Sequence, residues 1–339
     1  MPEAVPTDPI RVVDYHTAGE PFRIVTAGAP ELAGMTVLDR RSYAENHADP
    51  IRRLVVNEPR GHADMYGCFV TPPNDAGGDL GVVFFHKDGY STACGHGTIA
   101  LVTWAIESGL IAAAGPEQRV VVDTPSGRLE THAEIDGGRV VAVSFVNIPS
   151  FVSSHHLAVQ LASGVIDVAI SYGGAYYASV DAAELELAVI PQNLQQFIYL
   201  GREVKAILGD NPAVSHPIDA RLSGLYGTIF FENLGDVDAG LRQRNVTVFA
   251  DGEVDRSPCG SGTSARLALL DSAAQLPRGA TLIHDSIIGT TFTGSVIGDT
   301  EVAGQHAVIT RVRGSAHRTG SAVFTVDEDD ELGLGFQLR

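Results

Sequence analysis

A seven-residue motif occurs twice in this chain, about half a chain length apart. Cys94-Gly-His-Gly-Thr-Ile-Ala100 and Cys259-Gly-Ser-Gly-Thr-Ser-Ala265 share the pattern Cys-Gly-x-Gly-Thr-x-Ala. The offset, 259 − 94 = 165 residues, is close to half of the 339 in the chain. The repeat predicts two halves that each place one cysteine at the start of a helix, with the two thiols facing each other across one pocket. Gene duplication without shared chemistry is the alternative explanation.

Length and charge limit the domain count and the class of partner. A chain of 339 residues is long for a single core and suits two domains. We expect an N-terminal half of residues 1–149 with Cys94, a C-terminal half of residues 150–320 with Cys259, and C-terminal strands in 321–339 that can return to the first half. The formal net charge of −18 would repel a phosphate backbone, so we expect no nucleic-acid partner.

The sequence also bears on the compartment of the protein. The first residues lack the basic and apolar regions of a signal peptide. No stretch approaches the ~18 consecutive apolar residues of a membrane span. Three cysteines are too few for a disulfide framework in a chain of this size. We therefore expect a cytoplasmic protein with reduced thiols and no membrane partner, in which Cys68 is a buried core residue.

Each motif is followed by a run that predicts a buried helix. The run after Thr98 is apolar on nearly every side and closes at Gly109. Ala265–Leu276 has the same character and stops before Pro277. Most other segments predict short strands between glycine-rich turns, among them Leu54–His62 as strand and turn. The prediction is an α/β (α+β) fold of two halves, each with strands wrapped around a central helix and with the active site in the cleft between them.

A Cys-Gly-x-Gly junction at the start of a helix has defined chemistry. Its glycines let the backbone approach a ligand closely. The first amides of the helix have no partner within the helix, so they can donate to an anion such as a carboxylate. The helix dipole stabilises negative charge there, which predicts a lowered pKa for the cysteine and a larger thiolate fraction.

Two such junctions around one small anion predict inversion of configuration without a cofactor. A thiolate on one face can remove the α-proton of an amino acid while a thiol on the other face supplies a proton. The site must stabilise the carbanionic transition state and exclude water. Asp255, four residues before Cys259, is placed to meet a protonated amine. His96 could bind the carboxylate or tune the neighbouring thiol.

The two motifs also carry a family resemblance. Ala93–Ala100 and Asp255–Ala265 resemble the active-site signatures of the proline racemase superfamily, and the similarity extends to His16–Pro21 and Glu58–His62. That superfamily contains proline racemases, 4-hydroxyproline 2-epimerases and trans-3-hydroxy-L-proline dehydratases. The resemblance implies a diaminopimelate-epimerase-like fold, chemistry that needs no pyridoxal or other cofactor and no metal, a small-molecule substrate (proline or hydroxyproline), and often a homodimer.

The resemblance also implies roles for individual residues. Cys94 and Cys259 are implied as the catalytic acid/base pair. The implied substrate-binding residues are those that line the carboxylate site and the one that holds the ring nitrogen: Gly95, His96, Gly260 and Ser261 for the carboxylate, and Asp255 for the nitrogen.

Two signals disagree on the reaction. Leu225–Ile229 and Val248–Pro258 resemble the dehydratases, which generally carry threonine where Cys259 stands. Dehydration needs one base and loss of the 3-hydroxyl. Racemisation and epimerisation need an acid or base group on each face of Cα. The 4-hydroxyproline epimerases carry a histidine in a strand near Thr228, which is absent here. We place hydroxyproline 2-epimerase or proline racemase first by a small margin and trans-3-hydroxy-L-proline dehydratase second, with both activities in one enzyme a reasonable outcome.

Other classes of protein fit the sequence less well. A zinc site would need pairs such as Cys-x-x-Cys or His-x-x-x-His, and the chain has neither. A cysteine hydrolase with His96 as base leaves the second motif unexplained. A phosphate-binding loop would end in Gly-Lys-Ser/Thr, and neither motif does. A protein that binds amino acids, or senses redox state through a disulfide between the two thiols, remains as a non-enzymatic hypothesis.

Overall fold

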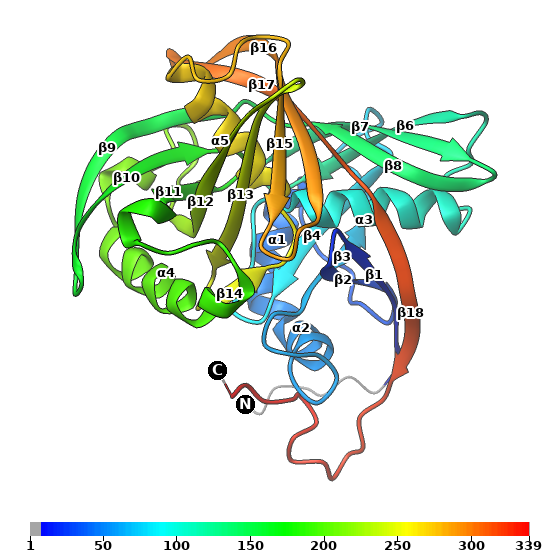
Figure 1. Ribbon diagram of the computed structural model, residues 1–339. Helices are drawn as coiled ribbons and strands as arrows, with labels where there is room; N and C mark the ends of the chain where they lie inside the picture. The colour runs from blue at the N-terminus through cyan, green and yellow to red at the C-terminus, as the bar shows by residue number, and fades with distance from the viewer. Residues whose placement is uncertain (1–7, 339) are drawn as a thin grey trace.

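The computed structural model describes residues 8–338 as a mixed α/β protein (Figure 1). The α-helices are α1 (Val37–His47), α2 (Asp49–Val56), α3 (Gly95–Glu107), α4 (Leu194–Leu208) and α5 (Gly260–Ser272). The strands of the first half of the chain are β1 (Ile10–Thr17), β2 (Glu20–Ala27), β3 (Tyr66–Thr71), β4 (Leu80–His86), β5 (Gly89–Tyr90), β6 (Glu117–Thr124), β7 (Gly127–Asp136) and β8 (Arg139–Val146). The later strands are β9 (Phe151–Leu161), β10 (Gly164–Tyr172), β11 (Tyr176–Asp181), β12 (Leu225–Val237), β13 (Gly240–Phe249), β14 (Glu253–Asp255), β15 (Thr281–Ser286), β16 (Thr291–Val302), β17 (Gln305–Gly314) and β18 (Ala316–Phe324).

Strand pairing repeats from one half of the chain to the other. In the first half the paired order is β1-β2-β3-β4-β6-β7-β8, with parallel pairs at β2–β3 and β4–β6 and antiparallel pairs elsewhere. In the second half the order β10-β11-β12-β13-β15-β16-β17 has parallel pairs at the same two steps. The duplicated motif is therefore part of a duplicated topology.

Each set of strands is followed by one more strand that pairs with the first strand of the other set. β9 follows β8 in sequence but pairs with β10, the first strand of the second set. β18 follows β17 but pairs with β1, the first strand of the first set, and Figure 1 shows it running down beside β1. β8 and β17 pair with each other and join the two sets of strands. The boundary at residue 149 stays a prediction.

Helices α3 and α5 are the buried helices of the two halves. In α3 every residue except Trp104 and Glu107 is buried, and α3 packs against β1, β2, β8 and β18. In α5 every residue except Asp271 and Ser272 is buried, and α5 packs against β9, β10, β16 and β17. The expectation of one buried helix per motif is confirmed. The described part of the chain contains no helix long and apolar enough to cross a membrane.

Two local predictions were wrong. Leu54–Val56 was expected to be strand but is the last turn of α2, where these buried side chains pack into the core beneath β4. Tertiary burial there overrides the strand preference of valine. The second helix was expected at Ala265–Leu276 but begins at Gly260 and ends at Ser272. The Gly-Ser-Gly-Thr segment winds into its first turn, and Ala274 with φ +54° ends it.

Candidate active site

Each motif cysteine caps the start of a buried helix. Cys94 is the N-cap of α3, and its Sγ accepts a hydrogen bond from the Gly97 amide at 3.2 Å. Cys259 precedes α5 with φ +63°, a left-handed conformation that costs a non-glycine residue free energy. Both side chains are only 5% exposed. The structure places one cysteine at the start of each helix, as the sequence predicted.

The first glycine of each motif lets the two helix starts touch. A Cβ added to Gly95 would lie 2.5 Å from the Gly260 Cα, and one added to Gly260 would lie 2.7 Å from the Gly95 Cα. No side chain fits at either position without moving the other backbone. Cys94 and Cys259 are thus the immediate neighbours of a glycine–glycine contact, which brings thiols 165 residues apart to one junction.

The remaining motif positions serve the sulfur atoms and the cysteine carbonyls. A Cβ at Gly97 would come within 2.7 Å of the Cys94 sulfur, and one at Gly262 within 2.9 Å of the Cys259 sulfur. The Thr98 hydroxyl donates to the Cys94 carbonyl at 2.8 Å, and the Thr263 hydroxyl donates to the Cys259 carbonyl at the same distance. The motif therefore encodes both the close approach of the helices and the room for each thiol.

A carboxylate–imidazole pair lies behind Cys94. Nε2 of His96 is 3.4 Å from the Cys94 Sγ, and Nδ1 of His96 is 3.3 Å from Oδ2 of Asp255. Burial alone would raise the pKa of Asp255, but His96 and the hydrogen bonds from Ser257 outweigh it and hold the pKa below its ordinary value. An ionised Asp255 accepts from Nδ1–H, which leaves the Nε2 lone pair facing the thiol. The arrangement lets His96 take the proton of Cys94.

Asp255 and His96 therefore lie together, although the sequence analysis gave them separate tasks. Asp255 was expected to hold a ring nitrogen, and His96 to bind a carboxylate or tune the thiol. The structure supplies the contact for the tuning role of His96. The contact of Asp255 with a substrate amine stays a prediction.

The Cys259 side of the junction has hydroxyl groups in place of an imidazole. The Tyr177 hydroxyl lies 3.7 Å from the Cys259 sulfur and 2.7 Å from the Ser261 hydroxyl. Tyr177 and Ser261 are both buried. Ser261 therefore reaches the Cys259 thiol through Tyr177, and its contact with a substrate carboxylate stays a prediction. The two cysteines have different neighbours, so their proton chemistry differs.

Sequence reasoning missed three tyrosines of the site. The Tyr66 hydroxyl is hydrogen-bonded to the hydroxyls of Ser91 and Tyr226, the latter at 3.0 Å. Tyr66 stacks edge-on against His96 with ring centroids 5.0 Å apart, and the rings of Tyr226 and Tyr177 are 5.7 Å apart. No spacing rule connects residues 66, 177 and 226, because strand pairing alone brings them together. Tyr226 did fall within the segment that resembles dehydratases.

Burial sets the pKa of both thiols in this closed site. It raises the pKa of Cys94 well above its ordinary value of 9.0, although the Gly97 amide and Tyr66 act in the opposite direction. It also raises the pKa of Cys259. The predicted lowering by the helix dipole is therefore outweighed, because a buried thiolate loses its hydration. A thiolate then depends on a proton acceptor such as His96.

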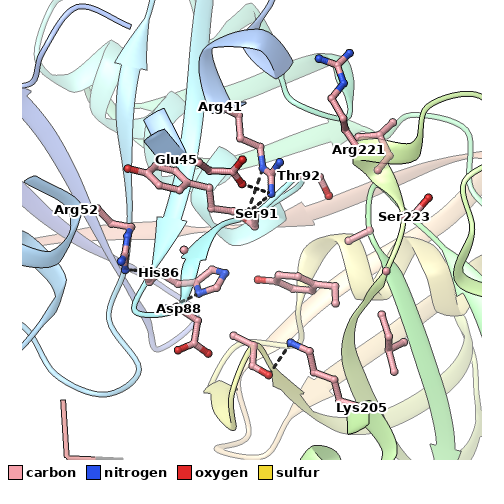
Figure 2. A pocket seen from close by; sticks show the side chains of 18 of the residues that line it. Arg41, Glu45, Arg52, His86, Asp88, Ser91, Thr92, Lys205, Arg221 and Ser223 are labelled. Atoms are coloured by element: carbon pink, nitrogen blue, oxygen red, sulfur yellow. Dashed lines mark hydrogen bonds and ion pairs between the residues drawn. The ribbon is translucent and has the colours of Figure 1, made fainter. Parts of the chain in front are cut away.

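A cavity of about 610 Å³ lies beside the site and between the two halves of the chain (Figure 2). Ser91 and Tyr226, the partners of the Tyr66 hydroxyl, are among its lining residues. Its cationic lining residues come from both halves: Arg41, Arg52, Lys205 and Arg221. The cavity therefore reaches the hydroxyls that hold Tyr66, and Cys94 and Cys259 are not among its lining residues. Within residues 8–338, no group of three or more His, Cys, Asp or Glu could hold a metal ion.

Sequence comparison gives two kinds of relative. The family described as "Proline racemase" matches residues 12–337. A trans-3-hydroxy-L-proline dehydratase of Bacillus cereus is 44% identical over 326 residues, which are 96% of this chain and 97% of that protein. A 3-hydroxyproline 2-epimerase of Burkholderia multivorans is 46% identical over 331 residues, which are 97% of this chain and 98% of that protein.

Structural comparison agrees with the sequence. A hydroxyproline epimerase of Agrobacterium vitis, solved with trans-4-hydroxy-L-proline bound, is 30% identical with a TM-score of 0.92, and the alignment covers 99% of this chain and 96% of that one. A PhzF-family protein of Bacillus anthracis, at 14% identity and a TM-score of 0.59, covers 94% of this chain and all of that one. The second likeness shows the fold alone, and it is the α/β fold that the sequence predicted.

Proposed function

Because the chain belongs to the proline racemase family, we propose that it removes the α-proton of a 3-hydroxyproline with Cys94 and Cys259 as its acid and base. The chain is an enzyme of that family, and the B. cereus and B. multivorans relatives are both named for 3-hydroxyproline. Proton return from the opposite face gives 2-epimerisation. Loss of the 3-hydroxyl gives dehydration. The observation that carries the proposal is the contact of two thiol-bearing helix starts at Gly95 and Gly260.

The helix starts supply the positive potential that an acidic chain otherwise lacks. The net charge of −18 disfavours a carboxylate in general. Two helices that meet start to start both present amides without helical partners and the positive ends of their dipoles. A substrate carboxylate at the Gly95–Gly260 contact is held from both sides. Its Cα then lies between the two sulfur atoms.

Proton removal begins at Cys94, because it has an imidazole within hydrogen-bonding distance. His96, held by Asp255, takes the thiol proton and leaves a thiolate that removes the α-proton. The burial that raises the thiol pKa also makes the thiolate a stronger base once it forms. Cys259, with Tyr177 as a neighbouring hydroxyl, returns a proton on the other face. Epimerisation is the first outcome we propose.

Dehydration is the second candidate, and the B. cereus relative favours it. It needs only the base on the Cys94 side and a proton for the departing hydroxyl. Because Cys259 is present, the same carbanionic intermediate can be protonated or lose water. We therefore propose that one active site produces both outcomes from 3-hydroxyproline.

Parallel incubations in D₂O under reducing conditions test this function. The purified enzyme is given trans-3-hydroxy-L-proline, trans-4-hydroxy-L-proline or L-proline, and chiral chromatography with mass spectrometry follows each. We expect deuterium at Cα, the opposite C2 configuration and a cyclic imine from the 3-hydroxy substrate, and slower or no reaction with the other two. No deuterium at Cα of any of the three would reject the function and favour an amino-acid-binding or redox-sensing protein.

A further inference from the structure

The stereochemistry of the proposed substrate defines where an acid is needed. In trans-3-hydroxy-L-proline the hydroxyl is on the opposite ring face from the carboxylate, and therefore on the same face as the α-hydrogen. The base that removes this hydrogen and the acid that protonates the departing hydroxyl must then come from the same side of the ring. Since His96 makes Cys94 the base, the acid is to be sought beside Cys94.

Tyr66 is the hydroxyl on that side. Its side chain is 1% exposed and belongs to the same buried cluster as Cys94. Tyr66 is also one of the groups that lower the pKa of the Cys94 thiol against the effect of burial. Its ring is fixed edge-on against His96 and stacks on Phe22 with centroids 6.1 Å apart. The hydroxyl is further held by Ser91 and Tyr226. Tyr177, by contrast, lies beside Cys259 and serves the opposite face.

We propose that Tyr66 is the catalytic acid that protonates the departing 3-hydroxyl, a role that rests on the proposed function. Cys94 thiolate takes the α-proton, and the electron pair of the C–H bond forms the C2–C3 double bond. The C3–O bond breaks, and the oxygen leaves with its electron pair and the Tyr66 phenolic proton as water. The Cys94 thiol then passes the captured proton to the Tyr66 phenolate, so both groups are restored. The enamine product tautomerises to the cyclic imine.

The surroundings keep Tyr66 a proton donor between turnovers. Burial, together with the nearby Cys94, raises the pKa of Tyr66 well above 10.0, so the phenol is protonated at neutral pH. The hydrogen bonds from Ser91 and Tyr226 stabilise the phenolate that forms briefly, and they act in the opposite direction on the same pKa. Ser91 and Tyr226 also line the large cavity, through which water can depart.

The test measures two outcomes of one substrate with the full-length enzyme. Wild type and Tyr66→Phe are incubated with trans-3-hydroxy-L-proline in D₂O. Dehydration is counted as imine trapped by borohydride as proline, and proton removal is counted as deuterium at Cα of recovered substrate. We expect dehydration to fall by at least ~100-fold in Tyr66→Phe, as for loss of a general acid, while exchange at Cα stays within about tenfold. The ratio of dehydration to exchange therefore falls by at least about tenfold.

Tyr177→Phe is the matched control, because it removes the same hydroxyl from the other thiol. We expect this variant not to lower the ratio of dehydration to exchange. Circular dichroism and the thermal midpoint verify that each variant is folded. If Tyr66→Phe does not fold, Ser91→Ala removes one of the partners that position the Tyr66 hydroxyl, and the same ratio should fall several-fold.

Three outcomes would overturn the role of Tyr66. They are an unchanged ratio in the tested variant, an equal fall in the Tyr177→Phe control, and a wild-type enzyme that exchanges the α-hydrogen without losing water. The last outcome would leave the proposed epimerase function standing. Absence of exchange and dehydration in wild type, in contrast, would reject the function itself.

Discussion

At the scale of single residues, the site is a pair of thiols with unequal partners. Cys94 faces an imidazole held by a carboxylate, whereas Cys259 faces the Tyr177 hydroxyl. In the proposed function, this asymmetry is the reason for giving initial proton removal to Cys94 and proton return to Cys259. Substitution of Cys94 should therefore have a different consequence from substitution of Cys259.

Replacing Cys259 by threonine should separate the two reactions. Cys259→Thr removes the acid on one face, so we expect epimerisation to fall by ~10²–10⁴-fold while dehydration continues. Cys94→Ser should abolish both, because the base of both reactions is lost. Chiral analysis and imine trapping measure the two products in each variant. Epimerisation retained in Cys259→Thr would contradict the assignment of two bases.

The sequence was sufficient for the cysteines and insufficient for their partners. Cys94, Cys259 and the motif glycines were predictable because the duplicated pattern and the chemistry of helix starts act locally. Tyr66 and Tyr177 were not, because nothing in their strand sequences marks them as site residues until β3 and β11 are placed against the helices. The raised pKa of the thiols was also not predictable, since burial depends on the whole core.

At the scale of elements, α3 and α5 meet through backbone alone. Gly95 and Gly260 leave no volume for a side chain at their contact. Local sequence located both helices because their apolar runs are long, but it put the start of α5 five residues late. In α2, the valines that suggested a strand are held in a helix by burial.

Gly95→Ala tests the helix contact. The new Cβ would lie 2.5 Å from backbone of Gly260, so one helix must move. We expect a loss of about 1–3 kcal/mol in the free energy of unfolding, as for overpacking of a core, and a fall of about 100-fold in activity because the thiols are displaced. Urea unfolding and the D₂O assay measure these.

Gly115→Ala is the control for that change, because a Cβ at Gly115 meets nothing within 4 Å. We expect this variant to keep the stability and activity of wild type. If the Gly95 variant behaves like the Gly115 variant, the close contact between the two helix starts does not govern catalysis.

At the scale of the whole molecule, a buried acid–histidine pair links the two halves. The Asp88 amide donates to Nδ1 of His86 at 3.2 Å, so Nδ1 is an acceptor and Glu253, 3.2 Å away, must donate as a neutral acid. Burial lowers the pKa of His86 to about 3 from 6.5, and raises that of Glu253 well above 4.5. The native pair therefore holds one proton throughout the pH range between these limits.

The pair makes stability depend on pH in a defined direction. Between pH 4.5 and 6.5 the unfolded pair also holds one proton, so its contribution is flat. Above pH 6.5 the unfolded pair holds none, and stability falls by about 1.4 kcal/mol per pH unit. Glu253→Gln keeps a donor to His86 and removes this titration. We expect the stability of the variant relative to wild type to rise with pH above 6.5 in urea unfolding, by up to about 1.4 kcal/mol per pH unit until the native Glu253 itself ionises. Parallel pH profiles would mean that Glu253 is ionised in the native protein.

The repeat predicted a duplicated molecule, and C-terminal strands in 321–339 were expected to be able to return to the first half. The strand that pairs with β1 is β18, Ala316–Phe324. β9 and β18 carry no copy of the motif. β9 forms a hairpin with β10, whereas the pairing of β18 with β1 joins strands from opposite ends of the chain. Local sequence patterns identified most strands. The pairing of the strands depends on the packing of the whole core, which no short segment of sequence encodes.

Because β18 of the second half pairs with β1 of the first, neither half is complete when it is produced as a separate molecule. A fragment of residues 1–149 lacks β18, so β1 becomes an open edge with its backbone donors and acceptors unpaired, which favours aggregation. The complementary fragment of residues 150–339 carries β18 with no strand to pair with. We expect each fragment to be insoluble when produced alone and the two to assemble when co-expressed, as seen by co-purification and recovered turnover. A soluble, folded 1–149 fragment would show that this polypeptide tolerates separation, and it would remove the reason for treating its two halves as one folding unit.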